Sequence, residues 1–383
     1  MKIVIFGLSI TSSWGNGHAT TFRALARALH ARGHDIVFFE KDQEWYASNR
    51  DMPEPPFCQM RIYQSWSQVR SAARAELRDA DVAVVGSYFP DSAKAIPLVF
   101  ESKVPVKAFY DIDTPITVAA LRSDAADYLR PDQVPGFHLY FSFTGGPLLQ
   151  ELESKFGAQM AVPLYCSFDP DRYRFAAVRP EYACDFSYMG TYAADRQDKI
   201  EELFCAPARK LPRKKFILAG PQYPESISWP GNVKRITHVA PASHAAFYSS
   251  SRLTLNVTRQ QMVRAGYSPS VRLFEAAACG TAIVSDYWEG LETFLTPGKE
   301  ILVPRSPDDV VEYLNTADYA EIARIGRNAR ERVLAEHTAD RRASEFEVAV
   351  EKTWTQRAGT GTLGRTADSE ETLARSAEHS SAG

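Results

Sequence analysis

Strand-like and helix-like segments alternate along almost the whole chain. Residues 2–8 (KIVIFGL) form an apolar run, and residues 18–33 follow with a helical period that places Phe22, Leu25 and Leu29 on one face. Near-continuous apolar strands joined by helices are typical of parallel sheets covered on both sides. We therefore predict strands at residues 2–8, 35–40, 82–88, 106–113 and 137–143 in the first half, and at residues 185–190, 215–220, 234–239, 253–258, 281–286 and 300–304 in the second.

This order predicts an α/β protein with two Rossmann-like, doubly wound parallel-sheet domains that face a cleft, closed by C-terminal helices. The expected domains are residues 1–168 and 169–340, because the join between them is rich in Pro, Asp and Arg and lacks a helical period. Residues 341–356 are expected to form a helix that packs back towards the first domain. Residues 357–383 contain only Leu363 and Leu373 as large apolar residues, so we expect a disordered tail.

Length and composition narrow the class of protein. A chain of 383 residues is longer than one core usually serves, and 45% hydrophobic with 24% charged residues is typical of a globular protein. The net charge of −3 gives no argument for nucleic acid or a membrane surface, and no apolar run approaches the ~18 residues of a membrane span. The five cysteines are scattered without a C-x-x-C pair, which favours reduced thiols in the cytoplasm and no zinc site.

Residues 268–286 (SPSVRLFEAAACGTAIVSD) carry a carboxylate inside an apolar helix. Ser268 and Pro269 are typical of a helix start, where backbone amides favour an anion. Glu275 lies seven residues further on, roughly 10 Å along the axis at ~1.5 Å per residue. That matches the separation of a diphosphate and the ribose diol of one nucleotide, and a carboxylate can accept both diol hydrogen bonds. The alternative is a helix charge that reaches solvent.

The segment RLFEAAACGTAIVSDYWEGLETFLTPGKEILV resembles the donor-binding segment of GT-B glycosyltransferases. The runs FYDIDTPIT, FSFTGGP, YCSFDPDRY and DFSYMGTYAADRQ are similar to the CgeB-like family within that class, so the resemblance covers most of residues 1–340. It implies that Glu275 holds the ribose of a nucleotide-diphosphate sugar. Retaining GT-B families carry another glutamate eight positions before the ribose glutamate, whereas this chain has Tyr267 there.

Other residues at strand ends of the second half suit the same ligand. Gly190 and Thr191 turn the chain before a helix, and arginines can neutralise a diphosphate leaving group without a metal. Each arginine could instead be a solvated loop charge, and a histidine after the third strand could be a packed core residue. The expected donor-binding residues are Glu275, Gly190, Thr191, Arg196, His238, Val239, Arg259, Arg264, Ser268, Ser270 and Val271.

In the first half, the loop before the first helix places His18 at the helix start. It resembles the glycine-histidine loop of inverting GT-B enzymes, where the histidine is the general base, and a helix N-terminus disfavours imidazolium. Asp111 and Asp113 alternate at a strand end, and we favour Asp113 as the partner that orients His18. His18 could instead be a phosphate donor, and the aspartates could cap the next helix. Acceptor-binding residues are expected at Asn16, Gly17, Thr144, Gly145 and Gly146.

The sequence therefore predicts a cytoplasmic, metal-independent glycosyltransferase that needs no cofactor beyond its nucleotide-diphosphate sugar. With His18 as base the reaction inverts the anomeric centre, whereas a retaining route is open if His18 only positions groups. A nucleotide-sugar epimerase and a non-catalytic nucleotide-sugar-binding module are the alternatives. No nucleic-acid partner and no stable membrane insertion are expected.

Overall fold

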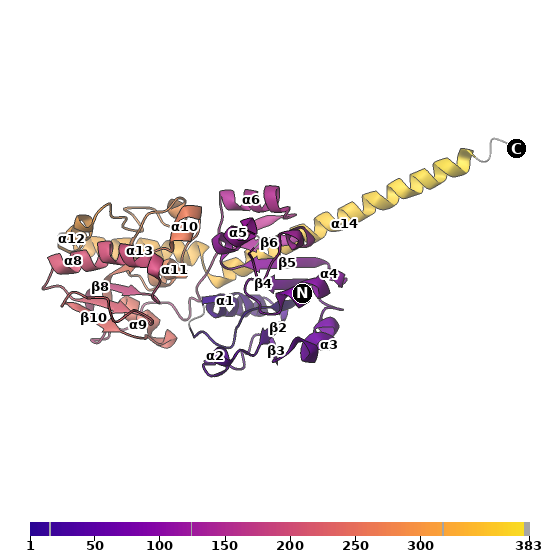
Figure 1. Cartoon of the computed structure of the whole chain (residues 1–383). Coiled ribbons are helices and arrows are strands. Elements are labelled where there is room, and N and C mark those ends of the chain that lie inside the picture. Colours follow the sequence, from indigo (N-terminus) through magenta and orange to yellow (C-terminus); the bar gives the residue numbers. More distant parts are fainter. Residues whose placement is uncertain (15–16, 124, 316–317, 379–383) are drawn as a thin grey trace.

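Two parallel sheets, each flanked by helices, make up the protein (Figure 1). The structure is a computed structural model that describes residues 1–14, 17–123, 125–315 and 318–378. The strand order is β3-β2-β1-β4-β5-β6-β7 in the seven-stranded sheet and β10-β9-β8-β11-β12 in the five-stranded sheet. The order reverses beside β1 and beside β8, and ligands of such sheets bind at the carboxyl ends of the strands next to this reversal. The predicted fold class is confirmed.

The first half contains seven strands and the helices between them. The strands are β1 (Lys2–Phe6), β2 (Asp35–Lys41), β3 (Gln59–Tyr63), β4 (Val82–Gly86), β5 (Val106–Asp111), β6 (Leu139–Ser142) and β7 (Ala161–Pro163). The helices are α1 (Gly17–Ala31), α2 (Glu44–Ala47), α3 (Trp66–Glu76), α4 (Ser92–Glu101), α5 (Thr114–Arg122), η1 (Pro131–Gly136) and α6 (Pro147–Phe156).

The second half repeats the alternation with shorter elements. Its strands are β8 (Cys184–Met189), β9 (Phe216–Ala219), β10 (Val233–Ile236), β11 (Ser251–Asn256) and β12 (Ala282–Ser285). Its helices are α7 (Ala194–Ile200), η2 (Glu201–Cys205), α8 (Ala206–Lys210), η3 (Pro241–Ser243), α9 (His244–Ser249), α10 (Gln260–Ala265), α11 (Val271–Ala278), η4 (Leu291–Thr293), α12 (Pro307–Asn315), α13 (Tyr319–Glu336) and α14 (Ala339–Glu378).

Alternate residues of each strand in the first sheet enter two different cores. In β1, Val4 and Phe6 pack with residues of α3 and α4, whereas Ile3 and Ile5 pack with residues of α1 and α14. Both faces are therefore buried, which explains why the strand reads as an unbroken apolar run. Each large apolar side chain buried in this way contributes about 1.5–3 kcal/mol.

The chain passes twice between the halves, and the two crossings lie side by side. The backbone N–H of Ala339 donates to the carbonyl of Phe168 at 3.0 Å, and Phe168 forms a parallel bridge with Thr338. After this point α14 lies on the first sheet, where the ring of Phe346 stacks on Phe141 with centroids 5.0 Å apart. The last helix thus belongs to the core of the first half, and it projects beyond the sheet (Figure 1).

Three expectations about elements differ from the structure. Residues 300–304 form no strand, since Ile301 and Leu302 make only isolated bridges. Strands β3 and β7 were not expected, because both are short edge strands with mixed sequences. The structure continues α14 to Glu378, whereas the sequence predicts disorder from residue 357. No helix within the described ranges combines the length and the apolar character needed to cross a bilayer.

Candidate functional site

His18 and Asp113 meet at the carboxyl edge of the first sheet, beside the strand reversal. His18 stands in the first turn of α1, and its Nε2 atom lies 3.0 Å from Oδ2 of Asp113, which occupies the N-cap position of α5. The two side chains are 10% and 29% exposed, so the pair is sheltered but reachable. A carboxylate bound to one ring nitrogen fixes the orientation and tautomer of the imidazole.

Asp111 has a different role from Asp113. It is fully buried, and its carboxylate accepts hydrogen bonds from the hydroxyls of Tyr140 at 2.6 Å and Thr117 at 2.7 Å. Burial raises the pKa of Asp111 to about 6, although these two hydroxyls oppose the rise. The structure therefore brings Asp113 to His18 and uses Asp111 to hold the turn between β5 and α5.

Tyr88, in the loop after β4, is a residue that the sequence analysis missed. Its backbone has φ +59°, a left-handed conformation that a bulky residue rarely adopts and that clusters at functional sites. Its ring meets the ring of His18 edge-on at 5.5 Å and lies 4.5 Å from the ring of Tyr128. Burial raises the pKa of Tyr88, the charge of Asp113 raises it further, and the charge of Arg259 lowers it. Nearby, α5 packs against α10 of the second half, which begins after Arg259, so this edge of the first sheet lies where the two halves meet.

The loop ahead of α1 is held by Glu40, at the end of β2. The carboxylate of Glu40 is fully buried and accepts four hydrogen bonds, from the backbone N–H groups of Ile10 and Thr11 and from the hydroxyls of Ser9 and Thr11. A buried charge is stable only when its acceptors are satisfied in this way. Glu40 therefore fixes the loop that leads to His18. Asn16 lies outside the described residues, and Gly17 is the first residue of α1.

Glu275 lies inside the second half and is 6% exposed, so it is not a solvated helix charge. Burial raises the pKa of the Tyr173 hydroxyl well above its usual value, and the negative charge of Glu275 adds to this rise. The same hydroxyl lies 3.2 Å from Nδ1 of His244, whose Nε2 lies 3.1 Å from the carbonyl of Val239. Tyr173 and His244 thus connect Glu275 to the loop after β10. His238 in that loop is exposed, and the strand ends at Ile236 rather than at residue 239.

The helix that carries Glu275 begins later than expected. Ser270 is its N-cap and Val271 its first residue, so the predicted start at Ser268 and Pro269 is wrong. Ser268 precedes a proline, which disfavours the helical region, and Tyr267 before it has φ +47°. The hydroxyl of Ser270 donates to Asn256 at 2.7 Å. Glu275 therefore lies five residues from the cap, about 7.5 Å at ~1.5 Å per residue.

Three arginines converge at the strand reversal of the second sheet. Arg196, in the first turn of α7, donates to the carbonyl of Thr191 at 2.5 Å. Burial lowers the pKa of Arg196, and the charges of Arg272 and Arg259 lower it further. Arg272 was not expected; its guanidinium donates to Met189 and Asn256 and would lie 2.8 Å from a Cβ at Gly190.

Arg259 and Arg264, which both follow β11, differ in their partners. Arg259 is paired with Asp195, with 2.8 Å between Nε and Oδ2, whereas Arg264 is exposed and donates to Gln260 within α10. Cations gathered at the carboxyl ends of parallel strands form a site suited to an anion. Arg196, Arg259 and Arg272 are therefore the candidate phosphate-binding residues.

Thr144, Gly145 and Gly146 lie in the contact between the halves. The hydroxyl of Thr144 is 2.9 Å from that of Ser268, and the N–H of Gly145 donates to the carbonyl of Tyr267 at 3.0 Å. Gly146 has φ +63°, and a Cβ there would lie 2.3 Å from the ring of Tyr267. Thr144 and Gly145 are buried, so the structure places this loop against the second half.

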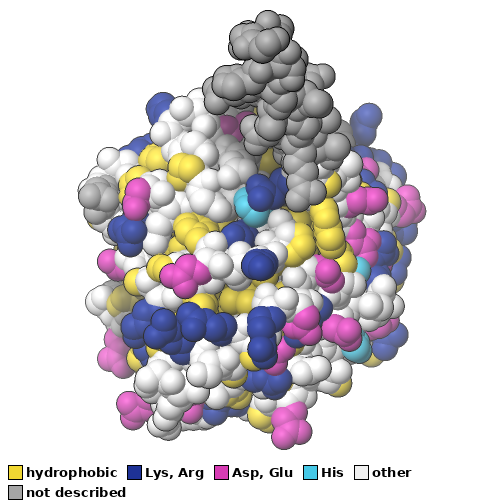
Figure 2. Space-filling model, turned by 90° about the vertical axis from the view of Figure 1, so that its right-hand side faces the viewer, with side chains coloured by type: hydrophobic (Ala, Val, Ile, Leu, Met, Phe, Trp, Pro, Cys, Tyr) yellow, Lys and Arg dark blue, Asp and Glu magenta, His cyan; other side chains and the backbone are white. Residues whose placement is uncertain are grey.

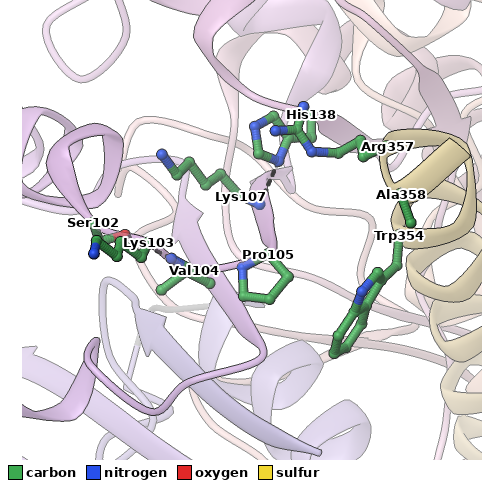
Figure 3. A pocket seen from close by; sticks show the side chains of 9 residues that line it. All are labelled: Ser102, Lys103, Val104, Pro105, Lys107, His138, Trp354, Arg357 and Ala358. Atoms are coloured by element: carbon green, nitrogen blue, oxygen red, sulfur yellow. Dashed lines mark hydrogen bonds between the residues drawn. The ribbon is translucent and has the colours of Figure 1, made fainter. Parts of the chain in front are cut away.

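A separate hollow of about 310 Å³ lies at the amino ends of β5 and β6, the edge opposite His18 (Figure 3). Trp354 forms one wall, and the backbone N–H of Lys107 donates to Nδ1 of His138 at 3.2 Å. Burial lowers the pKa of His138 to about 4, and the charges of Arg357 and Lys107 add to the effect. Basic side chains also gather on the face from which α14 projects (Figure 2).

Comparison with known proteins bears on the fold. The family described as glycosyl transferase-like matches residues 196–347, which include Glu275 and the three arginines. No curated protein sequence gives a significant match to the chain. Among solved structures, sucrose-phosphate synthase from Thermosynechococcus elongatus is 14% identical with a TM-score of 0.70, over 93% of this chain and 100% of that one.

Two further solved structures are similar in fold to this chain. HepE of Anabaena in complex with UDP and glucose is 14% identical, with a TM-score of 0.66 over 92% of this chain and 100% of that one. An alpha-glucosyltransferase in complex with UDP is 14% identical, with a TM-score of 0.67 over 91% and 99%. The fold is that of GT-B glycosyltransferases. In this GT-B fold, the two strand reversals place His18 and the arginine cluster at the loops where ligands of such sheets bind.

Proposed function

We propose that this protein transfers a sugar from a nucleotide-diphosphate donor to an acceptor hydroxyl or amine between its two halves. The observation that carries the proposal is the contact of α5, whose N-cap is Asp113, with α10, whose N-cap is Arg259. This contact supports a site in which the His18–Asp113 pair and the arginines of the second half act on the same substrates. The family match over residues 196–347 and the UDP complexes among proteins of like fold support the same activity.

In the proposed reaction the acceptor oxygen attacks the anomeric carbon of the donor sugar. The bond from that carbon to the diphosphate breaks, and its electron pair leaves with the diphosphate. His18, whose ring is held by Asp113 at Nε2, takes the proton of the acceptor as general base. A single displacement of this kind inverts the anomeric centre. Arg196, Arg259 and Arg272 take up the charge of the leaving group in place of a metal ion.

Glu275 is assigned to the ribose of the donor. Glu275 is 6% exposed, and its charge acts on the hydroxyl of Tyr173. The two hydroxyls of a ribose diol can each donate a hydrogen bond to its carboxylate. The nucleobase is assigned to the loop of His238 and Val239. The resemblance to the CgeB-like family, the domain limits at residues 168 and 340, and the cytoplasmic location remain predictions.

A thermal-shift screen against UDP-, GDP-, TDP- and ADP-sugars, with and without magnesium, tests the donor site. We expect one nucleotide to stabilise the protein without metal, and Glu275→Ala to lose that shift. His18→Ala should keep the shift but lose transfer, and the anomeric configuration of the product follows from proton NMR. A folded protein that responds to no nucleotide would contradict the proposal. Turnover of the donor to an epimer without an acceptor would favour an epimerase instead.

A further inference from the structure

Tyr88 and Tyr128 form an aromatic wall beside His18, here called the tyrosine pair. The ring centroids are 4.5 Å apart with planes inclined at 43°. Both residues are half-buried, so each ring keeps part of its surface exposed. Neither residue was expected from the sequence to belong to the site.

Two independent features hold the rings of the tyrosine pair in place. Tyr88 keeps a backbone φ of +59°, which costs free energy that the surrounding structure must supply. Tyr128 is fixed through its hydroxyl, which lies 2.7 Å from Oγ1 of Thr117, and Thr117 donates to buried Asp111 at 2.7 Å. A hydrogen-bonded chain from the protein interior therefore fixes Tyr128, and the ring of Tyr88 packs against it.

The pair has one polar and one apolar side. His18, which is bound to Asp113, meets the edge of the Tyr88 ring, whereas Tyr128 packs against the apolar core of the first half. A long-chain alcohol would need a continuous apolar groove, and a flat aromatic acceptor would need rings on both of its faces. One aromatic wall with polar groups beside it matches a pyranose, which has an apolar C–H face and a rim of hydroxyls.

We propose that the tyrosine pair is the acceptor subsite and that the acceptor is a saccharide. The inference rests on the proposed function, since it names the acceptor class of that same site. The apolar face of a pyranose lies against Tyr88 and Tyr128, and one of its hydroxyls is presented to His18. Asp113, which is 29% exposed on its side chain, can accept a second sugar hydroxyl. Tyr88 and Tyr128 are positioning residues, because they touch the substrate away from the reacting atoms.

The test is saturation-transfer NMR on the whole chain in the presence of UDP. The probes are methyl α-D-glucopyranoside, maltose and cellobiose, with 4-nitrophenol, decanol and a serine-containing tripeptide as representatives of other acceptor classes. We expect transfer to the ring C–H protons of at least one saccharide, with ring-current shifts to higher field. In Tyr88→Gly, saccharide affinity should fall at least about tenfold, while the thermal shift given by UDP stays unchanged.

Glycine is the right replacement because it adopts a positive φ without strain, so the ring is removed and the backbone is kept. Tyr88→Phe should retain most of the affinity, and Tyr128→Ala should lose it as Tyr88→Gly does. The matched control is Tyr319→Ala, an exposed tyrosine (69%) of the second half that should change nothing.

The outcomes separate the two proposals. If UDP gives no thermal shift in the wild-type protein, the proposed function fails. If UDP binds but no saccharide does, or if Tyr88→Gly binds saccharides as well as wild type, only the acceptor inference is overturned. Binding of decanol, 4-nitrophenol or the peptide in place of saccharides would overturn it too.

Discussion

Oδ2 of Asp113 lies 3.0 Å from Nε2 of His18, although 95 residues separate them along the chain. The contact exists because α1 follows β1 and α5 follows β5, and both strands end at the same edge of a parallel sheet. A histidine with one nitrogen bound to a carboxylate is oriented for proton transfer through the other.

The first prediction concerns this pair. His18→Ala should lower kcat for sugar transfer by about 10²- to 10⁴-fold, the usual contribution of a general base, and leave donor affinity unchanged. Asp113→Asn should give a smaller loss, because the imidazole remains but its orientation is less fixed. His30→Ala, an exposed histidine in the last turn of the same helix, is the control. Wild-type turnover in His18→Ala would show that His18 is not the general base.

The second prediction concerns Glu275 and the ribose. If its carboxylate holds the diol, the wild-type protein should bind its nucleotide at least about tenfold more tightly than the 2′-deoxy analogue, since hydrogen bonds to a charged group contribute about 1.5–3 kcal/mol. Glu275→Gln should lose this discrimination, measured by isothermal titration calorimetry. Tyr173→Phe is the matched variant, because it changes a neighbour of Glu275 but keeps the carboxylate, so it should keep the preference. Equal affinities for both nucleotides in the wild type would contradict the ribose assignment.

The third prediction is a pH dependence of stability. The pKa of Asp111 is raised from 3.8 to about 6 by burial, so the folded state holds its proton more tightly than the unfolded state. The associated stability is fully present below about pH 4 and is lost as the pH rises through about 6. The difference of about two pH units corresponds to about 3 kcal/mol. The unfolding free energy of Asp111→Asn should therefore rise relative to that of the wild type between pH 4 and pH 7, as measured by urea unfolding. A constant difference between the two proteins over this range would show that Asp111 does not titrate in the folded state.

The fold and part of the candidate site could be predicted from the sequence. Apolar runs and helical periods predicted both sheets, and the rule that ligands bind at strand ends selected His18. The choice between Asp111 and Asp113 could not be made from the pattern, because it depends on which side chain Tyr140 and Thr117 engage. That is a tertiary contact with no local signal.

Other features of the candidate site could not be recognised from a local pattern in the sequence. Tyr88 became noticeable only through its positive φ and its neighbours, and Arg272 only through the residues it reaches on β8 and β11. Ser268 carried a good helix-start signal that the structure does not use. The reason lies at Tyr267, whose left-handed backbone turns the chain before Pro269 and delays the helix to Val271.

The last prediction concerns this same tyrosine. The ring of Tyr267 is enclosed by glycines of both halves, since a Cβ at Gly146 would lie 2.3 Å from it and a Cβ at Gly290 2.4 Å from it. Gly146→Ala should cost roughly 1–3 kcal/mol of unfolding free energy, from this clash and from the φ of +63°. In a Tyr267→Gly background the clash disappears while the backbone strain remains, so the same substitution should cost less.

The difference between the two costs is the coupling between the halves at this point, and a double-mutant cycle in urea measures it. Gly231→Ala, where nothing lies within 4 Å of the added Cβ, is the control and should change stability by no more than about 0.5 kcal/mol. Equal costs of Gly146→Ala in both backgrounds would mean that the alanine is accommodated without touching Tyr267. The contact between the halves would then be looser than the enclosed ring implies.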